Sequence, residues 1–302
     1  MRLKLDETSA NTLAIGGEVL VSRLGFGAAN SLRQRWCGHP SQRRELLLTL
    51  LRLRRLAENG LILIDTGRLY GPDVSDTLIR VTLHPYDGVL LATKGGPCSM
   101  RHSVCGLLDT QAYLVQQAKI GLRTLNIKRH GLWQLGHVDP TIPYDEQLRA
   151  VRFLKDEGII HFVGLIEPKV TQIEQARTLF PVATVQGIYN LADRRNEEVL
   201  SYCERYGIGF IASLPLAAGY LAQEALLNRI ATNHGATPAQ IALAWLLKRS
   251  PVIVAIPGAT KVRHLDENMD AVNVRLSEQE FAELDQAGKQ MQPGLTEWLL
   301  RQ

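Results

Sequence analysis

The chain alternates short, almost wholly apolar segments with longer segments of helical period, and this alternation restricts its fold more than any other feature. The apolar segments are continuous runs such as LILIDT (61–66), GVLLATK (88–94) and IGFIASLPL (208–216). Such runs are typical of strands buried on both faces, as in a parallel sheet covered by helices. The segments between them, such as RRELLLTLLRLRRLAENG (43–60), carry the period of amphipathic helices, and several end at a glycine.

Eight strand candidates follow one another along the chain, most of them followed by a helix, with no repeat break or linker. This order predicts an α/β fold, a single (β/α)8 TIM barrel domain over residues 1–302. The segment TLAIGGEVLV (12–21) is typical of a β-hairpin, which we expect to close the bottom of the barrel. A doubly wound sheet is the alternative, but no G-x-G-x-x-G follows any strand, and GFGAAN (25–30) has the wrong third position.

Composition excludes several classes of protein. Of the 302 residues, 45% are hydrophobic and 21% charged, and the net charge of +4 comes from scattered residues, so we expect no nucleic-acid partner. The N-terminus has no signal-peptide core, and no apolar run reaches the roughly 18 residues of a membrane span, so we expect a cytoplasmic protein. The spacing of the four cysteines indicates neither disulfides nor a metal site: Cys37, Cys98, Cys105 and Cys203.

Three residues with proton-transfer chemistry stand where strands are expected to end. Asp65 ends the second strand, Tyr70 lies in the loop after it, and Lys94 ends the third strand. In a barrel of this kind, the active site lies at these ends. An ammonium lowers the pKa of a neighbouring phenol, and a carboxylate holds the ammonium in place. Singly each residue also fits a structural role, but together they predict a proton-donating group.

The same segments resemble the aldo-keto reductase family, whose members are NADPH-dependent carbonyl reductases built on this barrel. The similarity extends over almost the whole chain and includes VSRLGFGAAN (21–30), IDTGRLYGPDVSD (64–76), ATKGG (92–96), WQLGHVDP (133–140) and HLDENMDAV (264–272). The chain is most similar to an actinobacterial-type branch with W-G-P-P and H-R-x-D-P motifs, in whose places stand WCGHP (36–40) and GHVDP (136–140). The resemblance implies NADPH/NADP as cofactor and a small molecule as substrate.

The resemblance also implies a catalytic tetrad of Asp, Tyr, Lys and His, of which Asp65, Tyr70 and Lys94 match the first three. The tyrosine gives a proton to the carbonyl oxygen while hydride arrives from the nicotinamide. Gly136 stands at the histidine position, and His137 follows it. Because neighbours along a strand point to opposite faces, His137 enters the site only if a loop or bulge at Gly136 turns it inward. Otherwise His137 is a loop residue.

The nicotinamide end of the implied site departs from the family further. Ile166 stands where a serine binds the carboxamide, and Ser213 stands where an aromatic residue stacks on the ring. The adenosine-phosphate end is retained, with a helix N-terminus that suits anions and with basic residues that alternatively form a solvated helix face. The cofactor residues implied are Glu167, Gln186, Ser213, Leu214, Leu216, Ile256, Gly258, Ala259, Thr260, Lys261, Arg263, His264, Glu267 and Asn268.

Three functions are compatible with this pattern. The first is an NADPH-dependent oxidoreductase with an atypical tetrad, which reduces a carbonyl or an activated C=N or C=C bond and has Trp36 and Gly136 in its substrate pocket. The second is a non-redox dehydratase, isomerase or cyclase that keeps Tyr70 and Lys94 as acid and base. The third is a non-catalytic nucleotide-binding homologue. The sequence predicts neither the substrate nor the oligomeric state.

Overall fold

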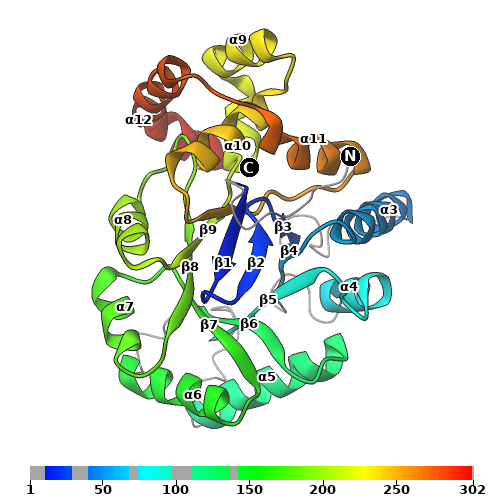
Figure 1. The fold of residues 1–302 in the computed structure, drawn as a ribbon, viewed down its shortest axis with the longest axis vertical. Helices are drawn as coiled ribbons and strands as arrows, with labels where there is room; N and C mark the ends of the chain where they lie inside the picture. Colours follow the sequence, from blue (N-terminus) through cyan, green and yellow to red (C-terminus); the bar gives the residue numbers. More distant parts are fainter. Residues whose placement is uncertain (1–10, 29–39, 68–73, 97–109, 137–141, 301–302) are drawn as a thin grey trace.

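The computed structural model describes residues 11–28, 40–67, 74–96, 110–136 and 142–300. Over these residues, eight parallel strands form a barrel surrounded by helices (Figure 1). The strands lie in the sheet in their order along the chain, from β3 to β10. That order confirms the predicted barrel and excludes the doubly wound sheet, in which the strand order reverses at a switch point.

The barrel strands are β3 (Phe26–Gly27), β4 (Ile62–Asp65), β5 (Val89–Gly95), β6 (His130–Leu135), β7 (Ile160–Ile166), β8 (Val182–Ile188), β9 (Gly209–Ser213) and β10 (Ile253–Ala255). The helices between and after them are α3 (Pro40–Ala57), α4 (Val74–Leu83), α5 (Thr110–Leu125), α6 (Tyr144–Asp156), α7 (Val170–Arg177), α8 (Glu197–Tyr206), α10 (Pro238–Arg249) and α11 (Val262–Asp270). Additional helical segments are η3 (Ala217–Gln223), α9 (Ala225–His234), η4 (Ala271–Asn273) and α12 (Glu278–Leu300).

The barrel closes between its first and last strands. Leu24 forms a parallel bridge with Ala255, and the Gly25 N–H donates to the Ala255 carbonyl at 2.9 Å. The backbones approach closely there, since a Cβ on Gly27 would lie 2.6 Å from the carbonyl oxygen of Ile256. Glycine is therefore required where β3 passes β10.

A hairpin of β1 (Thr12–Ile15) and β2 (Val19–Ser22) lies across the ring of strands (Figure 1). Its turn uses Gly16 and Gly17, whose φ angles of 61° and 75° favour glycine. Ile15 and Val21 are fully buried among the side chains that fill the barrel. The predicted hairpin and its role in closing the bottom are confirmed.

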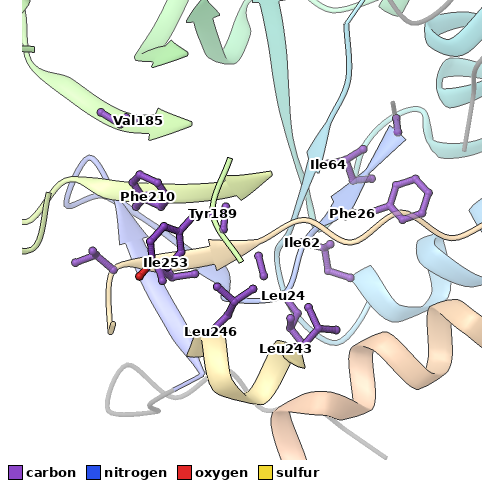
Figure 2. Close-up of a cluster of buried hydrophobic side chains, with 14 of the residues drawn as sticks. Leu24, Phe26, Ile62, Ile64, Val185, Tyr189, Phe210, Leu243, Leu246 and Ile253 are labelled. Carbon is purple, nitrogen blue, oxygen red and sulfur yellow. The ribbon is translucent and has the colours of Figure 1, made fainter. Parts of the chain in front are cut away.

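Two apolar layers hold the barrel together. The outer layer lies between strands and helices, and Figure 2 shows part of it, with Leu243 and Leu246 of α10 beside Leu24 and Ile253. The inner layer is filled by alternate residues of each strand, chiefly Leu63, Leu90, Leu132, Phe162, Ile211 and Val254. The residues two or four places further along several of these strands face the same interior nearer the carboxyl ends, where the predicted site lies.

The described residues contain no helix long and apolar enough to cross a membrane. Within the same ranges, no three His, Cys, Asp or Glu side chains gather as metal ligands would. Cys203 is buried as a free thiol in α8, and burial raises its pKa to about 12.

Candidate active site

A buried ion pair lies at the carboxyl ends of β4 and β5. Asp65 is only 1% exposed, and its Oδ1 receives the Lys94 ammonium, which also approaches the Thr66 carbonyl oxygen at 3.5 Å. Burial lowers the pKa of Lys94, whereas the Asp65 carboxylate and, further away on α4, Asp76 raise it. Burial is the larger effect, so the pKa of Lys94 lies below its ordinary value.

Two glutamine amides converge on the same carboxylate. Gln134 Nε2 of β6 donates to Asp65 Oδ1 at 3.1 Å, and Gln186 Nε2 of β8 approaches Asp65 Oδ2 at a longer 3.5 Å. Four strands thus contribute to one polar cluster inside an otherwise apolar barrel. Gln134 was not among the sequence-predicted site residues, and the signal for it is a lone amide in the apolar strand HGLWQL (130–135).

Three buried oxygen atoms on the inner strands have no hydrogen-bond partner among the described residues. They are Gln134 Oε1, Gln186 Oε1 and Thr184 Oγ1. Buried polar atoms in folded proteins are nearly always paired, so these three oxygens are candidate acceptors for a bound polar group.

Gly136 extends β6 without a bulge, because its N–H donates to the Gly95 carbonyl at 2.8 Å in the regular pairing with β5. Position 136 therefore faces the barrel interior as Gln134 does. A Cβ on Gly136 would lie only 3.2 Å from Cδ1 of Ile166. The Ile166 side chain thus takes the space beside Gly136. The prediction for His137 falls outside the described residues, as do those for Tyr70 and Trp36.

Glu167 follows β7 with a left-handed backbone, at φ 50°. Its Oε1 accepts the Ile188 N–H at 2.6 Å and its Oε2 accepts the Asn196 side-chain amide at 2.9 Å. Leu214, directly after β9, has a similar φ of 49°. Non-glycine residues with a left-handed backbone after β7 and β9, the two strands that flank β8, are typical of a functional site. The Glu167 carboxylate links β8 to the start of α8.

The predicted phosphate site lies at the start of α11. Lys261 is the N-cap residue and is exposed, and its side chain leaves the first N–H groups of the helix uncapped. Arg263 is 78% exposed and pairs with Glu267 at 3.3 Å, and His264 lies 3.4 Å from the same guanidinium. An uncapped helix N-terminus with exposed cations is suited to an anion.

The remaining predicted cofactor residues line the segments that lead to this helix. Ile256, Ala259 and Asn268 are buried, Ser213, Leu214, Leu216 and Thr260 are partly buried, and Gly258 is exposed. They belong to β9, to α11 and to the connections that follow β9 and β10, on one side of the barrel (Figure 1).

A family model described as the Aldo/keto reductase family matches residues 23–289. The chain belongs to the aldo/keto reductase family. It is 40% identical over 286 residues to an uncharacterized oxidoreductase of Schizosaccharomyces pombe, covering 94% of this chain and 92% of the relative. It is 32% identical over 284 residues to the pyridoxine 4-dehydrogenase of Escherichia coli, covering 92% and 98%.

Solved aldo/keto reductases share the fold. One from Klebsiella pneumoniae, in complex with NADP and acetate, is 27% identical, with a TM-score of 0.77 and coverage of 92% of this chain and 95% of that one. Another, a thermostable enzyme in complex with the inhibitor epalrestat, is 29% identical, with a TM-score of 0.78 and coverage of 91% and 98%. These similarities support an oxidoreductase with a (β/α)8 barrel fold. The reaction of this chain is inferred from its own residues.

Proposed function

We propose that this protein is an NADPH-dependent reductase with an atypical tetrad, which acts on a carbonyl or an activated C=N or C=C bond of a small molecule. The observation that carries the proposal is the buried Asp65–Lys94 pair at the barrel mouth, the arrangement that a proton-donating tyrosine requires beside it. The family relationship and the NADP-bound neighbour support it.

In this proposal the protein residues move the proton. Tyr70 gives its phenolic proton to the acceptor atom, and the Lys94 ammonium stabilises the phenolate that remains. Asp65 keeps that ammonium in place through the buried ion pair. NADPH, when bound, supplies the hydride.

The described residues fit this cofactor at both of its ends. Gln186 Oε1 is buried and unpartnered, and as an acceptor it suits the N–H groups of a carboxamide. The α11 N-terminus and its exposed cations suit phosphates. Residues proposed near the nicotinamide are Ser213, Leu214, Leu216 and Ile256, those for the phosphates are Gly258, Ala259, Thr260, Lys261, Arg263 and His264, and those for the adenine are Glu267 and Asn268. Glu167 has a supporting role, since Ile188 and Asn196 engage its carboxylate.

This enzyme is proposed to differ from its relatives at the position of the tetrad histidine, where it has Gly136. Gly136 offers no donor to the acceptor atom, and the Ile166 δ-methyl group next to it is apolar. In a reaction that develops negative charge on oxygen, removal of one hydrogen-bond donor from the site lowers kcat about 100-fold or more. An iminium or an activated alkene needs this donor less, so these acceptors are expected to react faster than simple aldehydes. Ile166 also narrows the room that Gly136 leaves for a bulky substrate.

The test is a titration with NADPH, followed by its consumption with a simple aldehyde, a ketone, an enone and a cyclic imine. Micromolar binding with perturbed nicotinamide fluorescence, and turnover of the enone or imine at least about tenfold above the aldehyde, is the expected result. Binding without turnover of any acceptor would contradict the reductase assignment.

A non-redox acid–base enzyme is the second candidate, favoured by one observation. The Glu167 carboxylate is engaged by Ile188 and Asn196, and Ile166 is apolar, so among the described residues these two positions offer the nicotinamide no hydrogen-bond donor. Absence of NADPH binding, together with conversion of a substrate that depends on Lys94, would favour this candidate.

A further inference from the structure

Gln134, on β6, donates a hydrogen bond to Asp65, and the proposed proton transfer by Asp65, Tyr70 and Lys94 gives this bond no role. It is fully buried, with no exposed surface, and its Nε2 lies 3.1 Å from Asp65 Oδ1, the oxygen that receives the Lys94 ammonium. A carboxylate that is only 1% exposed needs hydrogen-bond donors to remain charged. Gln134 is thus a neutral donor to an oxygen that must also hold a cation.

The neighbouring strands leave room for this amide. Gly164 of β7 is the registered partner of Gln134 on one side and of Thr184 on the other. A Cβ on Gly164 would lie 2.8 Å from Gln134 Cγ and 2.5 Å from Thr184 Oγ1. Any residue larger than glycine would therefore displace the two side chains. The barrel interior is shaped here around a glutamine in this conformation.

Two comparisons favour a role for the amide group over simple filling of the core. Leucine or methionine would fill the same volume without leaving Gln134 Oε1 buried and unpartnered. Gln186, the other amide at Asp65, approaches at 3.5 Å, which is long for a hydrogen bond. Of the two amides, Gln134 therefore makes the stronger hydrogen bond to the carboxylate.

We propose that Gln134 is a positioning residue, whose amide orients the Asp65 carboxylate so that Oδ1 meets the Lys94 ammonium. The expected effect on turnover rests on the proposed reductase function, whereas the orientation of Asp65 by Gln134 does not depend on it. Without the amide the carboxylate loses one of the donors that orient it, and its support of the Lys94 charge weakens. Among the residues that the structure describes, the charged groups that act on Lys94 are Asp65 on β4 and Asp76 on α4, and neither changes in the test below.

The test compares Gln134→Met with Gln147→Met. Gln147 is a buried glutamine of α6, outside the barrel, that donates to the Ile142 carbonyl at 3.1 Å, so its substitution also removes a buried amide bond. In Gln134→Met we expect kcat to fall about tenfold with little change in NADPH affinity. The alkaline limb of its pH profile should move about one unit lower, because a less supported Lys94 loses its proton sooner. Gln147→Met should leave the kinetics unchanged.

A second readout needs no activity. Acetylation of Lys94 by acetic anhydride across a pH series, read by mass spectrometry of its peptide, follows the protonation of that amine in the protein alone. We expect its midpoint to move to lower pH in Gln134→Met and in Gly164→Ala, and to stay in place in Gln147→Met. An unmoved midpoint in a folded Gln134→Met protein would overturn the positioning role. A moved midpoint in a protein that transfers no hydride would support positioning while the reductase function fails.

Discussion

The buried polar residues at the two ends of β6 differ in whether their hydrogen bonds are satisfied. At the amino end, His130 is 1% exposed, and its two ring nitrogens lie 2.9 Å from Thr93 Oγ1 and 2.9 Å from the Ala118 carbonyl oxygen. At the carboxyl end, Gln134 has an unpartnered oxygen, and Gly136 presents no side chain. A buried polar group with every atom paired serves the structure, whereas one with an unpaired atom calls for a further role, such as positioning or ligand binding.

The largest expected effect is at the carboxyl end. Lys94→Met should lower turnover about 1000-fold, because the proton donor loses its ammonium. It should also destabilise the fold by about 3 kcal/mol near pH 8, since Asp65 remains buried without its cation. Urea unfolding and initial rates measure the two effects.

The matched control for Lys94→Met is the double variant Asp65→Asn/Lys94→Met. It should recover most of the stability and none of the activity, since it removes the unpaired charge but does not restore the ammonium. Equal stability of Lys94→Met and the wild type would argue against a buried ion pair.

The next effect concerns Gly136 and Ile166, which are sterically coupled. A histidine at 136 would press on the Ile166 δ-methyl group, which lies 3.2 Å from the Cβ position. Gly136→His alone should therefore raise aldehyde reduction little, whereas Gly136→His with Ile166→Ser should raise it about 100-fold. Ile166→Ser alone should have a small effect. Simple additivity of the two single variants in kcat/KM would show that the residues are not in contact.

At the amino end, His130→Leu should cost about 2 kcal/mol of stability, because the Ala118 carbonyl loses its imidazole donor and Thr93 keeps only its longer 3.3 Å bond to the Leu132 carbonyl. Turnover at saturating substrate should stay within about twofold of the wild type. Thermal unfolding and kcat test this separation. A loss of kcat as large as that of Gln134→Met would remove the distinction between the two ends of β6.

The smallest expected effect is the contribution of His130 to the pH dependence of stability. Burial lowers the pKa of His130 below its ordinary 6.5. The unfolded chain therefore binds a proton near that pH before the folded protein does, and stability, fully present above about pH 6.5, declines as the pH falls. One proton sets a limit of about 1.4 kcal/mol per pH unit. Denaturation between pH 7.5 and 5 should show this slope, and His130→Leu should reduce it.

The sequence predicted the barrel because each strand is an apolar run and each helix is amphipathic, so local pattern and fold agree. It also predicted that Asp65 and Lys94 meet, since both stand at strand ends. It did not predict Gln134, because one amide in an apolar strand is equally typical of a satisfied core residue. It also did not predict that Ile166 lies beside Gly136, because this contact depends on the rotamer of the isoleucine side chain. Similarly, the hydrogen bonds of Glu167 depend on a left-handed backbone that the residue itself does not favour.

The most direct test of the central claim is whether hydride reaches a substrate. NADPH deuterated at the transferred position of nicotinamide C4 is incubated with the enone and imine acceptors, and the products are examined by mass spectrometry. The account predicts one deuterium in the reduced product, lost in Lys94→Met and retained in His130→Leu. A protein that binds NADPH and leaves every acceptor without deuterium would contradict it.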